Sequence, residues 1–398
     1  MKHAASFCFL TLALAALVPH GSAHAHEPDP TAKSQLLLAH YMPWYEAKPF
    51  SKQWGWHWTM NHFDPAKPTD GKREIASTYY PLIGPYDSAD PHVLEYHVLL
   101  MKLAGIDGVI VDWYGLTDYR DYAALNHNTT QILKQCERLN MKFVICYEDQ
   151  TIPALVKAKR IAATDRAAHA AKEIRWLSKY WFKSGAYVKL DGEPLLLSFG
   201  QTGLTDEEWS QCLKETEARV TYISQHHRRH VAHGAFDWPV PSDALAKWDQ
   251  FYRDSQRWPH AIPVAFPRFV DIYAEAKVSE SYGRLDDDGG ASLRKMLKRA
   301  GASKAAIVQI ATWNDWGEGT QIEPCHEFGY RDLEIVQEVR RPQFGQGFNL
   351  TPEDLRLPIR ILQRRRQVTS DEQKKSLDQI AQMIATGDLS AARTELSN

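Results

Sequence analysis

The sequence predicts an α/β fold: a single (β/α)8 barrel of the TIM type, with long loops after its strands and a helical C-terminal extension. From Leu36 onward, short apolar runs alternate with segments of helical periodicity, which is typical of parallel strands joined by helices. Eight such runs occur in a chain of 398 residues. Neither GxGxxG nor GxxxxGK is present, so a closed barrel is favoured over a nucleotide-binding sheet.

The N-terminal segment has the features of a secretory signal peptide. A positively charged start precedes an apolar run from about residue 4 to 18, and Ala23-His24-Ala25 supplies an Ala-x-Ala ending. We expect residues 1–25 to be this signal peptide, which predicts a secreted or periplasmic protein. No later run approaches the roughly 20 apolar residues of a membrane helix, so no membrane insertion is expected.

The eight predicted strands are Gln35–Tyr41, Ala76–Tyr80, Gly108–Asp112, Lys142–Tyr147, Pro194–Phe199, His230–Phe236, Ile262–Phe266 and Ala306–Thr312. The clearest predicted helices are Pro91–Ala104, Tyr122–Leu139, Arg166–Phe182, Asp206–Glu217 and Ala291–Arg299. Asp90 and Gly105 stand where the caps of the first helix belong. Residues 26–350 are therefore assigned to the barrel. Residues 351–398, with Leu and Ile at helical spacing, are expected to form two terminal helices.

Composition restricts the partners. The formal net charge is −2 and there is no long basic run, which disfavours nucleic acid. The 13 tryptophans and 17 tyrosines favour carbohydrate, because aromatic faces stack on sugar rings, although many will be core residues. After the leader, the cysteines have no CxxC spacing, which argues against a zinc ribbon; disulfides are permitted but not required. They are Cys136, Cys146, Cys212 and Cys325.

A barrel places its active site at the C-terminal ends of its strands. The end of the first strand and the loop behind it carry aromatic residues and histidines, which are Tyr41, Trp44, His57, Trp58 and His62. One interpretation is a sugar-binding platform with the histidines as hydrogen-bond donors. The alternative is a loop folded back with its rings buried. A metal site from His40, His57 and His62 is a third option, but no HExxH-like spacing supports it.

Acidic residues stand at other strand ends, each beside an aromatic residue. They are Asp112 with Trp113, Glu148 after Tyr147, and Asp237 with Trp238; Tyr80 ends the predicted second strand. Each acid could instead cap a helix or pair with an arginine. Three acids at three strand ends favour one shared site.

The strongest segment follows the last predicted strand, where Asp315 and Glu318 stand among Trp313 and Trp316, with Glu323 farther on. Cleaving a glycosidic bond needs a proton donor and a second carboxylate. Two nearby acids can hold different protonation states, because burial and mutual repulsion separate their pKa values. Asp315 and Glu318 are therefore the candidate catalytic residues. The alternative is that one acid of the pair is structural and its catalytic partner lies elsewhere.

At this segment the chain resembles glycoside hydrolase families 71 and 99. Trp313–Pro324 reads WNDWGEGTQIEP and is similar to the WNEWHEGTQIEP stretch of family 99, while its WNDWGE core also resembles family 71. Tyr41–Tyr45, Tyr80–Tyr86 and Gly105–Trp113 match as well. The resemblance implies a cofactor-free, metal-free (β/α)8 barrel that cuts α-linked oligosaccharides or polysaccharides, often inside the chain.

The family 99 likeness implies retention through a 1,2-anhydro sugar, with Asp315 as the base toward O2 and Glu318 as the acid/base. Glu148 would match an acid that binds the sugar near its 2-hydroxyl. Two positions depart from family 99: Asp315 replaces Glu and Gly317 replaces His. One methylene fewer moves the carboxylate by about 1.5 Å, and the family 71 likeness, which fits an aspartate there, implies inversion.

The sequence thus predicts a glycoside hydrolase of α-mannan-like or α-glucan-like substrates, and it makes no prediction of oligomeric state. A variant of this hypothesis pairs Glu148 as proton donor with Glu318 as nucleophile. Two alternatives from other classes are a catalytically inactive glycan-binding barrel and a glycan-processing transferase.

Overall fold

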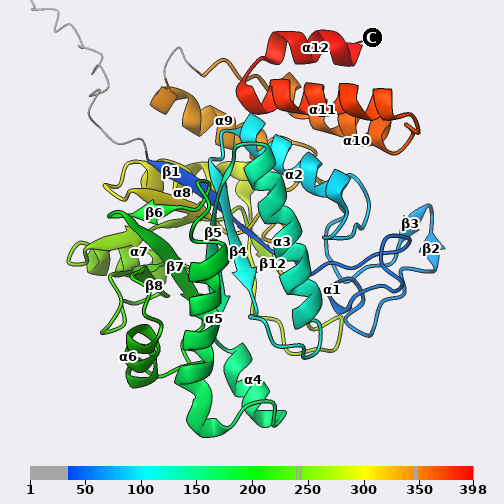
Figure 1. The fold of residues 1–398 in the computed structure, drawn as a ribbon. Helices are drawn as coiled ribbons and strands as arrows, with labels where there is room; N and C mark the ends of the chain where they lie inside the picture. Colours follow the sequence, from blue (N-terminus) through cyan, green and yellow to red (C-terminus); the bar gives the residue numbers. More distant parts are fainter. Residues whose placement is uncertain (1–34, 239–240, 242–243, 345–347, 398) are drawn as a thin grey trace, which may run out of the picture. The chain divides into compact units, whose positions relative to one another are not determined.

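The computed structural model describes residues 35–238, 241, 244–344 and 348–397, so the expected signal peptide lies outside the described residues. Nine short parallel strands form the central sheet (Figure 1). In the order of the sheet they are β10 (His260–Ile262), β9 (Gly234–Phe236), β8 (Thr221–Gln225), β7 (Glu193–Phe199), β5 (Lys142–Glu148), β4 (Gly108–Trp113), β1 (Leu36–Tyr41), β14 (Ile307–Ile310) and β11 (Val264–Ala265).

Pro263 explains why nine strands make an eight-stranded barrel. It alone separates β10, which pairs with β9, from β11, which pairs with β14. Proline has no N–H to donate to a ladder, but its carbonyl still accepts a hydrogen bond of 3.0 Å from the Gln309 N–H. β10 and β11 are thus one interrupted strand that closes the sheet. The predicted (β/α)8 barrel is confirmed.

Helices surround the barrel, and their caps follow the sequence (Figure 1). The long helices are α2 (Pro91–Ala104), α3 (Tyr122–Arg138), α5 (Arg166–Tyr180), α6 (Asp206–Glu215), α7 (Ala244–Ser255), α8 (Ala291–Gly301) and α9 (Arg331–Phe344). At the start of α2, Asp90 accepts a hydrogen bond from the His92 N–H, and Gly105 ends the helix with a φ of 83°. Both predicted caps are confirmed.

The remaining elements are short and lie in the connecting loops. They are α1 (Trp56–Thr59), α4 (Thr151–Lys157), the hairpin strands β2 (Pro68–Thr69) and β3 (Lys72–Arg73), β6 (Lys189–Leu190), β12 (Phe269–Val270), β13 (Arg284–Leu285), and the 3-10 helices η1 (Ala163–Asp165), η3 (Asp288–Gly290) and η5 (Pro352–Arg356). The long loops after β1 and β11 thus carry most of the irregular structure.

One predicted strand is wrong and one real strand was missed. Ala76–Tyr80 is loop; its apolar start reflects burial of Ile75 and Ala76 rather than a strand. β8 escaped prediction because it connects to β9 through residues 226–233 without a helix, which breaks the alternation that was counted. Only the last three residues of the predicted His230–Phe236 are strand. Asp112 therefore lies on the second barrel strand and Glu148 on the third.

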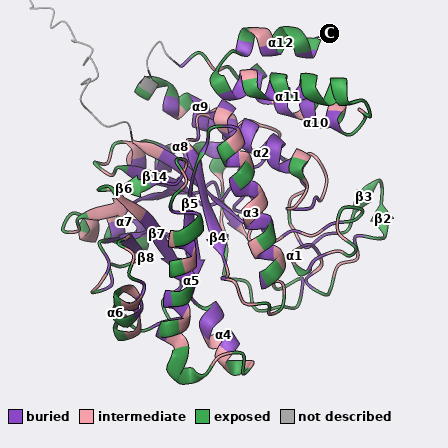
Figure 2. Cartoon of the chain, in the orientation of Figure 1, coloured by how far each residue is buried: buried purple, intermediate pink, exposed green. Residues whose placement is uncertain are grey.

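The C-terminal extension contains three α-helices, one more than predicted: α10 (Leu357–Arg365), α11 (Asp371–Thr386) and α12 (Leu389–Ser397). Figure 2 shows α11 and α12 with mixed buried and exposed faces. Arg365 of α10 contacts Glu95 of α2 through hydrogen bonds of 3.0 and 2.9 Å, which ties the extension to the barrel's helical layer. In the part of the chain that the structure describes, no helix is long and apolar enough to cross a membrane.

Candidate active site

The loop after β14 is held rigidly by Asn314. The side-chain Oδ1 accepts a hydrogen bond of 2.8 Å from the Met42 N–H, and Nδ2 donates to the Met42 carbonyl at 2.9 Å. The hydroxyl of Tyr45 donates to the Asn314 carbonyl and accepts from the Trp316 N–H, both at 3.0 Å. These buried contacts join the loop after β14 to the end of β1. Asp315 lies between Asn314 and Trp316 in the sequence, so the contacts of these two neighbours fix its backbone.

Asp315 and Glu318 lie on one tight turn of this loop. The Glu318 N–H donates to Oδ1 of Asp315 at 3.0 Å, and the Asp315 N–H donates to Thr312 Oγ1 at 2.8 Å. Burial raises the pKa of Asp315, while the backbone N–H groups of Glu318 and Gly317 counteract the rise. The structure therefore brings the two predicted catalytic acids together.

The environment of Glu318 is different. Glu318 as a whole is partly exposed, but its Oε2 atom is buried and has no hydrogen-bond partner. Burial raises the pKa of Glu318 well above its ordinary value, and the charges of Asp315 and Asp271 raise it further, against a hydrogen bond from Tyr273. Glu318 thus favours the protonated form and Asp315 the ionised form.

Strand alternation brings two more acids to the same place. Trp113 stacks on Trp176 of α5 with centroids 6.3 Å apart, and Tyr147 donates to Glu173 of the same helix. Both rings therefore point out of the barrel. Since neighbouring residues of a strand point to opposite faces, Asp112 and Glu148 point into the barrel.

These four carboxyl groups form what we call the acid row: Glu148, Asp112, Asp315 and Glu318. Burial and then the charge of Asp315 raise the pKa of Asp112; burial and then the charge of Asp112 raise the pKa of Glu148. The electrostatic neighbours of each acid indicate this order along the row. Among the described residues, no Arg, Lys or His forms an ion pair with any of the four.

The loop after β1 places an aromatic stack beside the row. Trp44 and His57 lie parallel, with ring centroids 4.2 Å apart and 7° between their planes. Trp44 contacts Tyr114 edge-on at 6.5 Å, and the charges of Asp112 and Glu148 raise the pKa of Tyr114 after the larger effect of burial. Trp44 and His57 are thus linked to the row through Tyr114.

Several predicted binding residues lie beneath the site in a buried polar network. The Tyr41 hydroxyl contacts His97 Nδ1 at 3.0 Å, and His97 Nε2 contacts Glu323 at 3.0 Å. Tyr86 donates to Glu323 at 2.7 Å and accepts from the Trp316 ring N–H at 3.2 Å. This network supports the loop after β14, so Tyr41, Trp316 and Glu323 are placed to position the acids rather than to face a sugar.

Other predicted binding residues are buried in the core or lie away from the acid row. Trp58 is fully buried and donates to the Tyr86 carbonyl, and the Trp313 ring lies 5.5 Å from His97. His62 is exposed beside Phe63. Tyr80 accepts a hydrogen bond from the Arg73 N–H at the β2–β3 hairpin. With Trp113 in the helical layer, the structure does not bring these five predicted residues to the acid row.

Asp237 has its own partner and belongs to a different cluster. Its carboxylate lies 3.6 Å from His226, and burial raises its pKa while His226 opposes the rise. Trp238 packs on His40, with ring centroids 4.7 Å apart.

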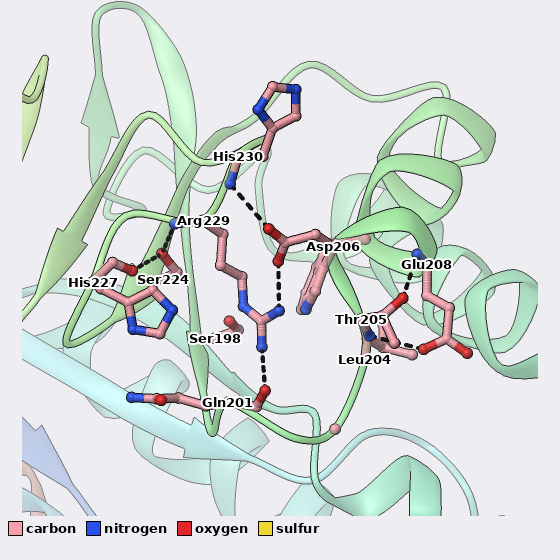
Figure 3. A network of polar contacts seen from close by, with 12 residues as sticks. Ser198, Gln201, Leu204, Thr205, Asp206, Glu208, Ser224, His227, Arg229 and His230 are labelled. Atoms are coloured by element: carbon pink, nitrogen blue, oxygen red, sulfur yellow. Dashed lines mark hydrogen bonds and ion pairs between the residues drawn. The ribbon is translucent and has the colours of Figure 1, made fainter.

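Figure 3 shows the neighbouring loops after β7 and β8 tied together by Arg229, which donates to Asp206 and to the Gln201 carbonyl. The contacts of Arg229 thus hold these two neighbouring loops together.

Sequence reasoning missed Tyr273 and Asp271, which lie in the loop after β11. The Ile272 N–H donates to the Gly317 carbonyl at 3.0 Å, and the Val270 N–H donates to the Glu318 carbonyl at 2.9 Å. This pairing sets Tyr273 against Glu318. No local motif marks a loop tyrosine as a site residue, so the sequence offered no signal for it.

His40, His57 and His62, which the sequence offers as one option for a metal site, do not form such a site. Within the described ranges, no group of three or more His, Cys, Asp or Glu side chains is arranged to hold a metal ion. Burial lowers the pKa of His40 to about 3, so its ring is neutral. Cys136, Cys146, Cys212 and Cys325 are all free and buried.

Comparisons with known proteins connect this site to glycan chemistry. Residues 32–220 match the model of glycosyl hydrolase family 99, and residues 289–336, which include Asp315 and Glu318, match that of glycosyltransferase WbsX. The glycoprotein endo-α-1,2-mannosidase of Mus musculus is 32% identical over 328 residues, which cover 72% of this chain and 67% of the mouse protein. That of Rattus norvegicus is 30% identical over 332 residues, covering 72% of this chain and 67% of its own.

Solved structures show the same fold. The family 99 endo-α-mannosidase from Bacteroides thetaiotaomicron has a TM-score of 0.58 at 18% identity, covering 76% of this chain and 97% of that chain. A glycoside hydrolase-like protein has a TM-score of 0.54 at 12% identity, covering 79% of this chain and 97% of its own. At these identities the likeness concerns the barrel alone.

Proposed function

The chain belongs to glycoside hydrolase family 99, and we propose that it hydrolyses α-linked, mannose-containing glycans with Asp315 and Glu318 as its catalytic acids. The observation that carries this proposal is the unequal environment of the two carboxyl groups on one turn. Asp315 accepts backbone N–H groups that stabilise its charge, whereas Glu318 has a buried oxygen without a partner. A base and a proton donor are what glycosidic cleavage requires.

The chemistry follows from these two protonation states. Asp315 takes the proton of the substrate's 2-hydroxyl, O2 attacks the anomeric carbon, and the glycosidic oxygen leaves with the proton of Glu318. Water then opens the 1,2-anhydro sugar, with Glu318 accepting a proton from the water and O2 recovering one from Asp315. Retention of the anomeric configuration is the expected outcome.

Leaving-group rescue tests the two roles. On an unactivated α-mannoside, Asp315→Asn and Glu318→Gln should each lower kcat by about a thousandfold, within the range of lost general acid or base catalysis. On an aryl glycoside with a good leaving group, Glu318→Gln should recover much of its rate because the leaving oxygen no longer needs a proton. Asp315→Asn should not recover.

The competing assignments give different outcomes. If Glu148→Gln loses activity on the unactivated α-mannoside but recovers it on the aryl glycoside, while Asp315→Asn keeps full turnover, Glu148 is the proton donor and Glu318 the nucleophile. Inversion, followed by NMR of the first-formed anomer, would rule out the anhydro-sugar route. Binding without cleavage by the wild-type protein would support the inactive barrel.

The match to glycosyltransferase WbsX over residues 289–336 favours transfer as a second candidate function. An anhydro intermediate can be opened by a sugar hydroxyl as well as by water. Product analysis with an added acceptor sugar separates the two: transfer products that outnumber hydrolysis products would favour a transferase.

A further inference from the structure

Two exposed aromatic rings, on two different loops, are connected to the acid row through intervening side chains. Single exposed apolar side chains are normal on a folded protein, so exposure alone does not mark a binding site; these two rings are also held in place by contacts that connect them to the acid row. Trp56 in the loop after β1 is 40% exposed, and Tyr282 in the loop after β11 is 59% exposed.

Trp56 is joined to the row through a continuous series of ring contacts. It packs edge-on against His57 with centroids 4.9 Å apart, and His57 stacks on Trp44, which contacts Tyr114. His57 is fixed from the other side by Asp121, 3.5 Å from its Nε2. Trp56 therefore leads to the end of the row that Asp112 and Glu148 occupy.

Tyr282 leads to the other end. Its ring packs edge-on against Tyr273 with centroids 5.7 Å apart, and Tyr273 hydrogen-bonds Glu318. Asp271 holds this arrangement, because its carboxylate accepts hydrogen bonds from the Tyr282 N–H at 2.8 Å and the Tyr273 N–H at 3.3 Å. The exposed ring of Tyr282 is thus held in place and is separated from the proton donor by one ring, that of Tyr273.

We propose that Trp56 and Tyr282 are two outer sugar-binding platforms, so that the preferred substrate is a linear α-glycan long enough to contact both. This rests on the proposed function. A flat, pre-positioned aromatic ring binds the apolar C–H face of a sugar at little entropic cost. Sugars that lie over Trp56 and Tyr282 flank the bond at the acid row, which favours cleavage inside a chain.

Binding measured without turnover tests the platforms separately from catalysis. In a Glu318→Gln background, calorimetry with linear α-mannooligosaccharides of two to six residues should give affinity that rises with length. Adding Trp56→Ala or Tyr282→Ala should weaken binding of the longest ligand about three- to tenfold, the scale of one aromatic contact. Binding of the disaccharide should stay unchanged.

Tyr180→Ala is the matched control, because Tyr180 is also exposed, at 50%. It lies at the C-terminal end of α5, which leads into β7, and is therefore on the side of the barrel where the strands begin, away from their C-terminal ends. Trp56→Tyr and Tyr282→Phe keep a ring and should keep the length dependence. Equal losses on short and long ligands, or affinity that does not respond to either alanine variant, would overturn the proposal. Failure of the wild-type protein to hydrolyse any α-mannoside would instead count against the proposed function.

Discussion

At the scale of single residues, the acid row places ionisable carboxyl groups where folding alone would not. Its four carboxyl groups are largely buried, lack basic partners among the described residues, and raise one another's pKa values. A buried charge without a partner costs stability. Such groups are retained in enzymes because their shifted pKa values suit proton transfer.

Replacing Asp112 by Asn should therefore stabilise the protein at neutral pH. Burial and the neighbouring Asp315 raise the pKa of Asp112, so the folded state binds its proton more tightly than the unfolded state does. The stability that this group contributes is complete below its unfolded pKa, near 4, and is lost as the pH rises through the folded value. We expect Asp112→Asn to raise Tm by about 1–3 °C at pH 8 and to leave it unchanged near pH 3.5.

Thermal unfolding followed over this pH range gives the measurement, with Asp118→Asn as the control. Asp118 lies exposed on the loop that follows the same strand, and its replacement should shift stability by no more than about 0.5 kcal/mol. A lower Tm for Asp112→Asn at pH 8 would mean that the ionised carboxylate is well solvated in the folded protein.

At the scale of elements, the loop after β14 acts as one unit whose shape depends on Asn314. We predict that Asn314→Ala costs about 2–4 kcal/mol of stability, because it leaves buried backbone groups of Met42 unpaired. It should also lower kcat about tenfold or more with a smaller effect on KM, since Asp315 would no longer be held in its working position.

Steady-state kinetics on the folded variant separates this positioning role from a purely structural one. Tyr45→Phe removes the hydroxyl that bridges the Asn314 carbonyl and the Trp316 N–H, and should change kcat in the same direction by less. An Asn314→Ala enzyme that keeps wild-type kcat below its Tm would contradict the prediction.

The sequence was sufficient for the barrel and for the two acids after its last strand, because strand periodicity and the position of strand ends are local properties. It was insufficient where tertiary packing decides. Asp112 and Trp113 are adjacent in the chain, yet one points into the barrel and the other into the helical layer. Glu323 and Tyr41 carry the kinds of polar group that bind substrates, but these groups form hydrogen bonds within a buried network. Tyr273 lies beside Glu318 because the loop after β11 pairs with the loop after β14, and these two loops are distant in sequence.

At the scale of the whole molecule, most of the tryptophans that suggested carbohydrate are core residues. Trp58, Trp113, Trp209, Trp313 and Trp316 are fully buried, as expected for a large barrel with two layers to fill. Composition alone therefore overstated the sugar-binding surface. The informative rings are Trp56 and Tyr282, which are exposed and connected to the acid row through intervening side chains.

The C-terminal helices contribute stability without taking part in the site. Arg365 pairs with the buried Glu95 of α2 and with Asp378 of α11, and Arg138 of α3 also reaches Glu95. Arg365→Met should lower the free energy of unfolding by about 2–4 kcal/mol, because Glu95 would lose one of its two charged partners. The value of kcat/KM below the Tm should not change, since these partners lie in the outer helices.

Arg364→Met provides the comparison for denaturant unfolding. Arg364 precedes Arg365 in the chain, but among the described residues its guanidinium donates to the backbone carbonyls of Glu395 and Leu396 and to no carboxylate, so its loss should cost about 1 kcal/mol or less. Equal destabilisation by the two variants would show that the Glu95 pair adds nothing beyond an ordinary surface contact. A fall in kcat/KM for Arg365→Met alone would mean that the extension transmits its packing to the acid row through α2.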